Sequence, residues 1–425
     1  MRAAIVCVLV CALAWPKPSR GYAVLAHEAI IDAAWDTQIK PLLLARFPGS
    51  TEEQLSEAQA YAYGGSIIQD MGYYPYGSHF FSDLTHYVRS GDFVQALLRD
   101  AKNLDEYAFA VGALSHYAAD NDGHRLATNR AVPLLYPRLR KKYGDPISYE
   151  QDPLAHTKTE FGFDVLEVAQ ESYAPDGYHD FIGFEVSQDL LEPAFQEVYG
   201  LPLYEVLPDE DKALNSYRHA VSKTIPMATK VAWSLKKDEI EAALPGVTKK
   251  RFLYNLSKSN YEREWGKNYQ KPTLRERFFA FLYKLIPKFG PLRVLQFKTP
   301  TPETQRMFRA SFNVTLSAYQ GMLEDLRSGR LDLPNDNFDL GEFTGPGKYD
   351  LNDNAHAQLL DKLANRKFAG ISPALREEIL HFYSDPGASY ATKRDARAWA
   401  TVQTELALLR NVPPSLASAG VSARP

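Results

Sequence analysis

Apolar residues recur with the spacing of an α-helix along most of this 425-residue chain, and glycines and prolines separate the periodic stretches. The clearest of them, residues 104–121, is mostly apolar. The other helical stretches are residues 23–46, 52–70, 80–100, 153–172, 187–235, 302–330 and 354–410. The alternation that is typical of strands is scarce. The pattern therefore predicts an all-α fold of many packed helices.

Local signals mark some of the helix ends. The sequence TEEQ, which begins at Thr51, is a capping box and predicts the start of a helix. Breaks are expected near Pro41 and at Ser90-Gly91. The sequence MGYYPYG, residues 71–77, predicts an aromatic loop.

The N-terminus has the features of an export signal. A positively charged start, Met1-Arg2, precedes an apolar run over residues 3–15, which is too short to anchor the chain in a bilayer. Ser19 and Gly21 form the small-x-small pattern of a cleavage site, which predicts a cut before Tyr22; a cut after Ala23 is the alternative. We therefore expect residues 1–21 to be removed and the protein to be periplasmic or extracellular.

Cysteine usage restricts the chemistry of any metal site. Cys7 and Cys11 both lie in the segment expected to be removed, so the mature chain would have neither disulfides nor thiol ligands. A metal ion would have to be held by His, Asp, Glu or backbone groups. The net charge of −4 lacks the basic excess of a general nucleic-acid binder, and no stable nucleic-acid partner is expected.

Histidines are concentrated in the N-terminal part of the chain. Six of the ten lie between residues 27 and 156: His27, His79, His86, His116, His124 and His156. Two of them lie in predicted helical stretches with an acidic residue four positions on, His116 before Asp120 and His156 before Glu160, which places each pair on one face of a helix. The polar sequence HYAADNDGH ends an apolar helix, where such a cluster is costly unless it binds something. This context predicts a metal site.

The order of these residues resembles that of the zinc-dependent phospholipase C and single-strand-specific nuclease superfamily, over roughly residues 22–240. The family order is a mature N-terminal residue, His, Asp, His, His-x-x-x-Asp, His and His-x-x-x-acid. The matching residues here are Tyr22, His27, Asp70, His86, His116, Asp120, His124, His156 and Glu160. His79 is the alternative to His86.

The resemblance implies an all-helical enzyme with three zinc ions. Asp70, His86, His116 and Asp120 would hold the first ion. His124, His156 and Glu160 would hold the second. Asp120 would bridge to the third, completed by His27 and by the amine and carbonyl of Tyr22, so that signal removal would finish the site.

The resemblance also implies a reaction. Zinc-bound hydroxide would attack the phosphorus of a phosphodiester, and Asp70 could act as general base. Aromatic residues are the candidates for substrate binding, namely Tyr73, Tyr74, Tyr76 and Tyr87. Packing is the alternative role for the tyrosines of the aromatic loop. Met71 stands where known phospholipases of this family place a choline-binding aromatic.

The expected organisation is therefore a signal peptide over 1–21, a phospholipase C-like catalytic domain over 22–245, a helical C-terminal region over 246–410 and a disordered tail over 411–425. The basic and aromatic segment 249–299 could contact a membrane or be a core helix flanked by lysines. The predicted function is a secreted phospholipase C-like hydrolase of phospholipids or other phosphodiesters. The alternatives are a nuclease or nucleotidase on the same scaffold and a non-catalytic, exported lipid-binding protein.

Overall fold

The computed structural model describes residues 23–74, 76–170, 185–207, 209–219, 236–242 and 296–412. The α-helices are α2 (Val24–Ala34), α3 (Lys40–Arg46), α4 (Glu52–Gly65), α5 (His79–Tyr87), α6 (Ser90–Asp100), α7 (Leu104–Gly123), α8 (Asn129–Leu135), α9 (Pro137–Tyr143), α10 (Pro153–Gln170), α12 (Gln188–Tyr199), α13 (Glu210–His219), α17 (Pro302–Arg327), α18 (Asp350–Asn365), α19 (Pro373–Phe382) and α20 (Ala396–Arg410). Short π turns are η1 (Trp35–Ile39) and η3 (His124–Thr128), and 3-10 turns are η2 (Ile68–Tyr73), η4 (Leu203–Glu205) and η7 (Ala391–Arg394). The described residues contain no β-strand, only an isolated β-bridge between Asn337 and Glu342. The all-α prediction is confirmed.

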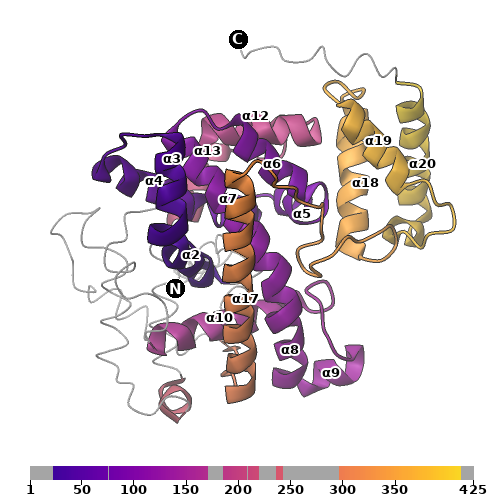
Figure 1. Cartoon of the computed structure of the whole chain (residues 1–425). Helices are drawn as coiled ribbons and strands as arrows, with labels where there is room; N and C mark the ends of the chain where they lie inside the picture. The colour runs from indigo at the N-terminus through magenta and orange to yellow at the C-terminus, as the bar shows by residue number, and fades with distance from the viewer. Residues whose placement is uncertain are drawn as a thin grey trace, which may run out of the picture.

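Helix α7 runs through the middle of the molecule, with other helices packed around it (Figure 1). Its apolar residues are buried on every side, as the sequence of residues 104–121 predicts. The side chain of Asn103 caps the first turn by accepting a hydrogen bond from the backbone N–H of Glu106 at 2.9 Å. The helix ends in the polar sequence that contains the predicted metal ligands.

Helices α4 and α7 pack unusually close together because glycines stand at their contact. A Cβ atom on Gly112 would lie 2.1 Å from the carbonyl oxygen of Ala62, and one on Gly65 would lie 2.0 Å from that of Phe109. No side chain larger than hydrogen fits at either position without moving the backbone. This approach places the end of α4 beside the middle of α7, where His116 lies.

Helix α17 covers a second side of α7, and the Tyr319 hydroxyl donates to the carbonyl oxygen of Val111 at 3.0 Å. Helices α18, α19 and α20 form the orange and yellow group of Figure 1, in which α18 packs against α5. Buried residues of the N-terminal and C-terminal parts belong to one hydrophobic core. The predicted boundary near residue 245 lies outside the described residues and stays a prediction.

Two predicted helix breaks are present, each a few residues before the predicted position. The first helical stretch is interrupted by the π turn η1, whereas Pro41 is accommodated in the first turn of α3, where its missing N–H costs little. The second break comes at Arg89, which has a φ of 52°, so that Ser90 already begins α6. The capping box is confirmed, because Gln54 N donates to Thr51 Oγ1 at 3.3 Å and Thr51 N donates to Gln54 Oε1 at 2.9 Å.

Several predictions concern residues outside the described ranges. They are the signal peptide over 1–21, Tyr22, residues 220–235 of a predicted helical stretch, nearly all of the segment 249–299 and residues 413–425 of the tail. Among the described residues, none of the helices combines the length and the hydropathy that crossing a bilayer requires.

Candidate metal centre

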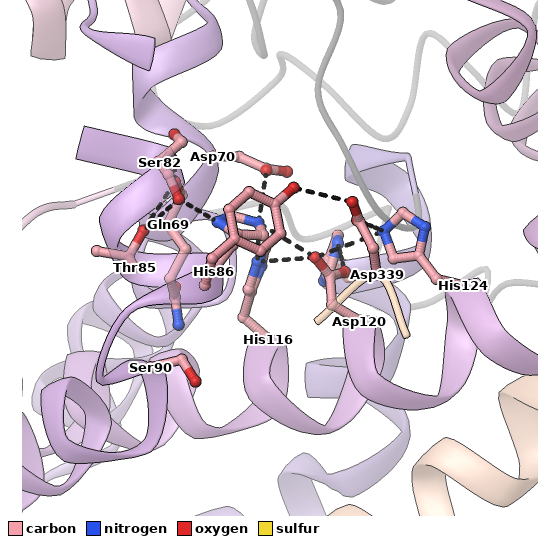
Figure 2. Close-up of polar contacts among 12 residues, drawn as sticks. Gln69, Asp70, Ser82, Thr85, His86, Ser90, His116, Asp120, His124 and Asp339 are labelled. Atoms are coloured by element: carbon pink, nitrogen blue, oxygen red, sulfur yellow. Dashed lines mark hydrogen bonds and ion pairs between the residues drawn. The ribbon is translucent and has the colours of Figure 1, made fainter. Parts of the chain in front are cut away.

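Eight of the nine predicted metal ligands are described, and the structure brings them together inside the protein. Asp70, His86, His116, Asp120 and His124 face one another in Figure 2. The eight residues are His27 on α2, Asp70 on η2, His86 on α5, His116 and Asp120 on α7, His124 on η3, and His156 and Glu160 on α10. Glu160 is 2% exposed and the other seven are fully buried.

The first group gathers around His86. Its Nε2 lies 3.4 Å from Asp70 Oδ1 and 3.3 Å from Asp120 Oδ2. His116 Nε2 lies 3.3 Å from the same Asp120 oxygen, because the two residues are one helical turn apart on α7. Three elements that are separate in sequence thus direct four ligand atoms to one point.

The two oxygens of Asp120 face different partners. Oδ2 faces His86 and His116, whereas Oδ1 lies 3.4 Å from Nε2 of His27. The ring of His27 stacks on that of His116, with centroids 4.5 Å apart and planes 12° apart. Asp120 is therefore placed to bridge two ions, which is the role that the resemblance implies for it.

A further group consists of His124, His156 and Glu160, each of which offers a ligand atom within 4.8 Å of the other two. His156 Nδ1 lies 3.6 Å from Glu160 Oε1, one turn along α10. His124 begins the π turn η3, and its Nε2 lies 3.8 Å from Asp120 Oδ2. Such irregular turns are frequent at functional sites because they change the direction of a side chain on a helix.

Backbone carbonyls orient three of the imidazole rings. His86 Nδ1 lies 2.8 Å from the carbonyl oxygen of Ser82, and His116 Nδ1 lies 2.9 Å from that of Ser66, at the end of α4. His156 uses the opposite nitrogen, with Nε2 2.8 Å from the carbonyl oxygen of Ile147. A nitrogen that donates to a carbonyl leaves the other as a lone-pair ligand, which is the arrangement around histidines that bind metals.

The spacing of the donor atoms fits zinc better than it fits direct pairing. Charge-assisted hydrogen bonds between nitrogen and oxygen are about 2.7–2.9 Å long. Two ligands bound tetrahedrally to one zinc at about 2.0–2.1 Å lie about 3.3–3.4 Å apart. The His–carboxylate pairs of the first group and of His27 are 3.3–3.4 Å apart, which matches the second value.

Hydrogen bonds from the described residues do not compensate the carboxylates of the centre. None of the side-chain oxygens of Asp70, Asp120 and Glu160 accepts a hydrogen bond from the described residues. An ion that is buried without a partner costs several kcal/mol, so these groups need a cation. A donor set of neutral imidazole nitrogens and carboxylate oxygens fits zinc.

The electrostatic setting favours metal ligation. Burial, with a contribution from neighbouring histidines, lowers the pKa of His27 and that of His156 to about 3, so both rings are neutral at physiological pH. Burial raises the pKa of Glu160. Burial also opposes charge on His86, but Asp120 and Asp70 outweigh it and raise the pKa of His86 to about 10. The acidic side of the centre thus attracts positive charge, which a metal ion can provide.

His86 and His79, the two alternatives for one ligand position, have different surroundings. His86 belongs to the first group, whereas His79 begins α5, is partly exposed and has its ring centroid 5.3 Å from that of Tyr73. No group of potential ligands found among the described residues includes His79.

The four aromatic residues expected to bind substrate do not form one exposed surface. Tyr73 and Tyr74 are buried, because the 3-10 turn η2 extends to Tyr73 and turns this part of the predicted loop inward. Tyr76 is 62% exposed, and its φ is 64°. Tyr87 is buried, and its hydroxyl donates to Asp339 Oδ2 at 2.9 Å. Their role in substrate binding stays a prediction.

Asp339 is an acidic neighbour of the centre that the sequence analysis missed. It lies in the segment between α17 and α18, and its Oδ1 is 3.5 Å from His124 Nε2. The ligand pattern gave no sign of it. The only available signal was local composition, since residues 335–347 are rich in Asn, Asp and Gly.

Comparison with known proteins finds a similarity for the N-terminal part of the chain. Residues 26–207 match the family model of zinc dependent phospholipase C, and this region contains all eight described candidate ligands. No curated protein and no solved structure matches the chain. Over residues 26–207 the chain is therefore similar to zinc-dependent phospholipase C, and this similarity supports a hydrolase that acts on phosphoester bonds.

Proposed function

We propose that the protein is an exported phospholipase C-like phosphodiesterase with three zinc ions. The observation that carries the proposal is the convergence of eight buried His, Asp and Glu side chains into overlapping ligand groups. The family match supports zinc and a phospholipid substrate. The number of ions, the ligand role of each residue and the export of the chain belong to the proposal.

The proposed assignment follows the distances between donor atoms. Asp70, His86 and His116 hold one ion with Asp120 Oδ2, and Asp120 Oδ1 joins His27 at another. The amine and carbonyl of Tyr22 complete the position beside His27 after signal removal. The remaining ion is held by His124, His156 and Glu160.

The chain's own residues fix the geometry of the reaction. Carbonyl contacts hold His86 and His116 with Nε2 toward the centre, and Asp120 keeps the neighbouring positions together. Zinc ions bound there supply Lewis acidity, which makes water nucleophilic near neutral pH and neutralises charge on the phosphoryl oxygens. The attack by hydroxide that the resemblance implies stays a prediction.

Asp70 is the proposed general base. Neither of its side-chain oxygens accepts a hydrogen bond from the described residues, so the oxygen that does not hold the ion is available to a proton. Asp70 takes the proton from water as the water oxygen bonds to phosphorus and the ester P–O bond breaks. That proton then passes to the leaving alkoxide oxygen, which balances the hydrolysis.

Parallel assays of the processed chain test this function. We expect hydrolysis of phosphatidylcholine vesicles and of a nitrophenyl phosphodiester, and no cleavage of single-stranded DNA. Cleavage of DNA without lipid hydrolysis would favour the nuclease alternative. Lipid binding without zinc or turnover would favour the non-catalytic one. Membrane contact by residues 249–299 stays a prediction, because the structure describes only the end of that segment.

A matched pair of histidine variants connects turnover to the centre. His86→Ala removes a proposed ligand and should lower both zinc content and lipid hydrolysis, by about 100-fold or more for the latter. His79→Ala changes the same residue type on the same helix, outside the ligand groups. The His79 variant should keep its zinc; equal zinc loss in both variants would refute the assignment.

A further inference from the structure

The segment between α17 and α18 reaches the metal centre from the C-terminal part of the chain, outside the region that matches the family. Residue Asp339 of this segment is 0% exposed, although it lies on a connection between helices. Figure 2 shows its carboxylate beside His124 and near Asp120. A connecting segment that buries a carboxylate next to a cluster of histidines calls for a physical reason.

The two oxygens of Asp339 have different surroundings. Oδ2 accepts hydrogen bonds from the hydroxyls of Tyr87, at 2.9 Å, and of Tyr349. Oδ1 accepts no hydrogen bond from the described residues and lies 3.5 Å from Nε2 of His124. That imidazole nitrogen also has no hydrogen-bond partner there. Two unsatisfied buried atoms therefore face each other at a distance beyond an ordinary charge-assisted hydrogen bond.

The backbone around Asp339 is fixed as well. Asn129 Nδ2 donates to the carbonyl oxygen of Asp339 at 2.7 Å, and the backbone N–H of Asp339 donates to Asn337 Oδ1 at 3.0 Å. Gly341 has a φ of 66°, and a Cβ there would lie 2.3 Å from the carbonyl oxygen of Asn121. The turn thus requires glycine in order to lie against the end of α7.

The preceding residues of the segment pack on the first ligand group. Phe338 is fully buried, and its ring lies against those of His86, His116 and Tyr117, with centroids 5.2–6.0 Å apart. Its backbone N–H donates to the carbonyl oxygen of His86 at 3.2 Å. The segment is therefore an integral wall of the centre, which places Asp339 with the accuracy that a ligand needs.

We propose that Asp339 is a fourth protein ligand, through Oδ1, of the ion that His124, His156 and Glu160 hold. This inference rests on the proposed function, since it requires that ion to be present. The 3.5 Å separation from His124 resembles the 3.6 Å between His156 and Glu160 in the same group. Three protein ligands leave one position of a tetrahedral zinc to water or a further donor, and a carboxylate oxygen is a suitable fourth donor. Tyr87 and Tyr349 then orient the ligand by hydrogen bonds to its other oxygen.

Retention of this ion would consequently depend on the C-terminal part of the chain. The variant that tests this is Asp339→Asn, which keeps an oxygen for the tyrosine hydroxyls but removes the charge. The matched control is Asp336→Asn, the same change on the same segment at a partly exposed residue whose carboxylate accepts a hydrogen bond from the Tyr117 hydroxyl. Zinc per chain is measured by elemental analysis after dialysis against graded chelator concentrations, and the visible spectrum is recorded after exchange into Co²⁺.

The wild-type protein and Asp336→Asn should retain three ions equally. Asp339→Asn should lose one ion at a chelator concentration at least 10-fold lower and should show a changed Co²⁺ spectrum. Asp339→Asn with the affinity and spectrum of the wild type would overturn the inference. A wild-type chain that takes up no zinc would overturn the proposed function itself, so the two failures are distinguishable.

Two further variants locate the lost ion and guard against misfolding. His156→Ala and the double variant His156→Ala/Asp339→Asn should have equal zinc contents, because both residues serve the same ion. An additional loss in the double variant would contradict the assignment. Tyr349→Phe leaves the carboxylate in place and removes one hydrogen bond to it. It should weaken the same ion, and unchanged chelator resistance would count against a ligand oriented in this way.

Discussion

Asp120 and His27 face each other across the centre, with Oδ1 of the carboxylate 3.4 Å from Nε2 of the ring, while Oδ2 of the same carboxylate faces His86 and His116. One side chain on α7 thereby connects a candidate ligand on α2 with the candidate ligand group around α5. The carboxylate of Asp120 therefore lies beside three candidate histidine ligands at once.

Asp120→Asn should consequently disturb two ions at once. We expect zinc content to fall by up to two ions per chain, and turnover to fall at least as far as in His156→Ala, which touches one group. Zinc content by elemental analysis and initial rates on a phosphodiester provide the measurement. A variant that loses less zinc than His156→Ala would show that Asp120 does not bridge.

The free amine of the processed chain should be needed for the position next to His27. A form that keeps additional residues before Tyr22 has no amine there and should lose one ion, with most of its activity. The control is the same extended protein after proteolytic removal of the added residues, which should regain the ion. Full activity of the extended form would rule out the N-terminal ligand.

The close contact of α4 and α7 should be essential for the orientation of His116. Gly112→Ala places a Cβ 2.1 Å from the carbonyl oxygen of Ala62, and the resulting backbone shift should cost about 1–3 kcal/mol in the free energy of unfolding. It should also weaken zinc binding, since Ser66 at the end of α4 orients His116. Denaturant unfolding and zinc titration measure the two effects.

Gly321→Ala is the matched control for that substitution. Gly321 lies within α17, and apart from its neighbours and the helix's own backbone no atom lies within 4 Å of an added Cβ, so alanine should stabilise the helix by about 0.5–1 kcal/mol. Equal effects of the two alanines would mean that α4 and α7 are not in close contact.

Asp32 should make stability depend on pH. Burial, opposed by hydrogen bonds from Tyr63 and Gln59, raises the pKa of Asp32 to about 7. Between the ordinary pKa of an aspartate, about 3.9, and 7 the folded state holds a proton that the unfolded state has lost, so this group's contribution to stability falls as pH rises. Asp32→Asn should remove the effect.

The measurement for Asp32 is the difference in unfolding free energy between Asp32→Asn and the wild type, from pH 4 to pH 8. As pH rises, the unfolding free energy of Asp32→Asn should increase relative to that of the wild type, by up to about 1.4 kcal/mol per pH unit. The difference should become constant above pH 7. A difference that is constant over this range would contradict the raised pKa.

Sequence reasoning found the features that depend on local order. The pairs His116–Asp120 and His156–Glu160 follow from helical spacing, and in the structure the paired donor atoms lie 3.3 Å and 3.6 Å apart. The capping box at Thr51 is equally local. His27, Asp70 and His86 required the resemblance to a family, because nothing in their spacing says that α2, η2 and α5 meet at α7.

Other features depend on tertiary contacts and gave no sequence signal. The π turns at Trp35 and His124 interrupt stretches whose composition is ordinary for a helix. Asp339 lies on a connection without periodicity, and its approach to the centre depends on Asn129 and on the close contact at Gly341. Such a residue can be recognised only when the packing of the segment is known.

Zinc stoichiometry of the processed chain tests the central claim most directly. Elemental analysis of protein purified without chelators and dialysed against trace-metal-free buffer should give close to three zinc ions per chain, with loss of phosphodiester hydrolysis on chelation and recovery on adding zinc. A correctly folded chain that hydrolyses phosphodiesters with no bound metal would contradict the account.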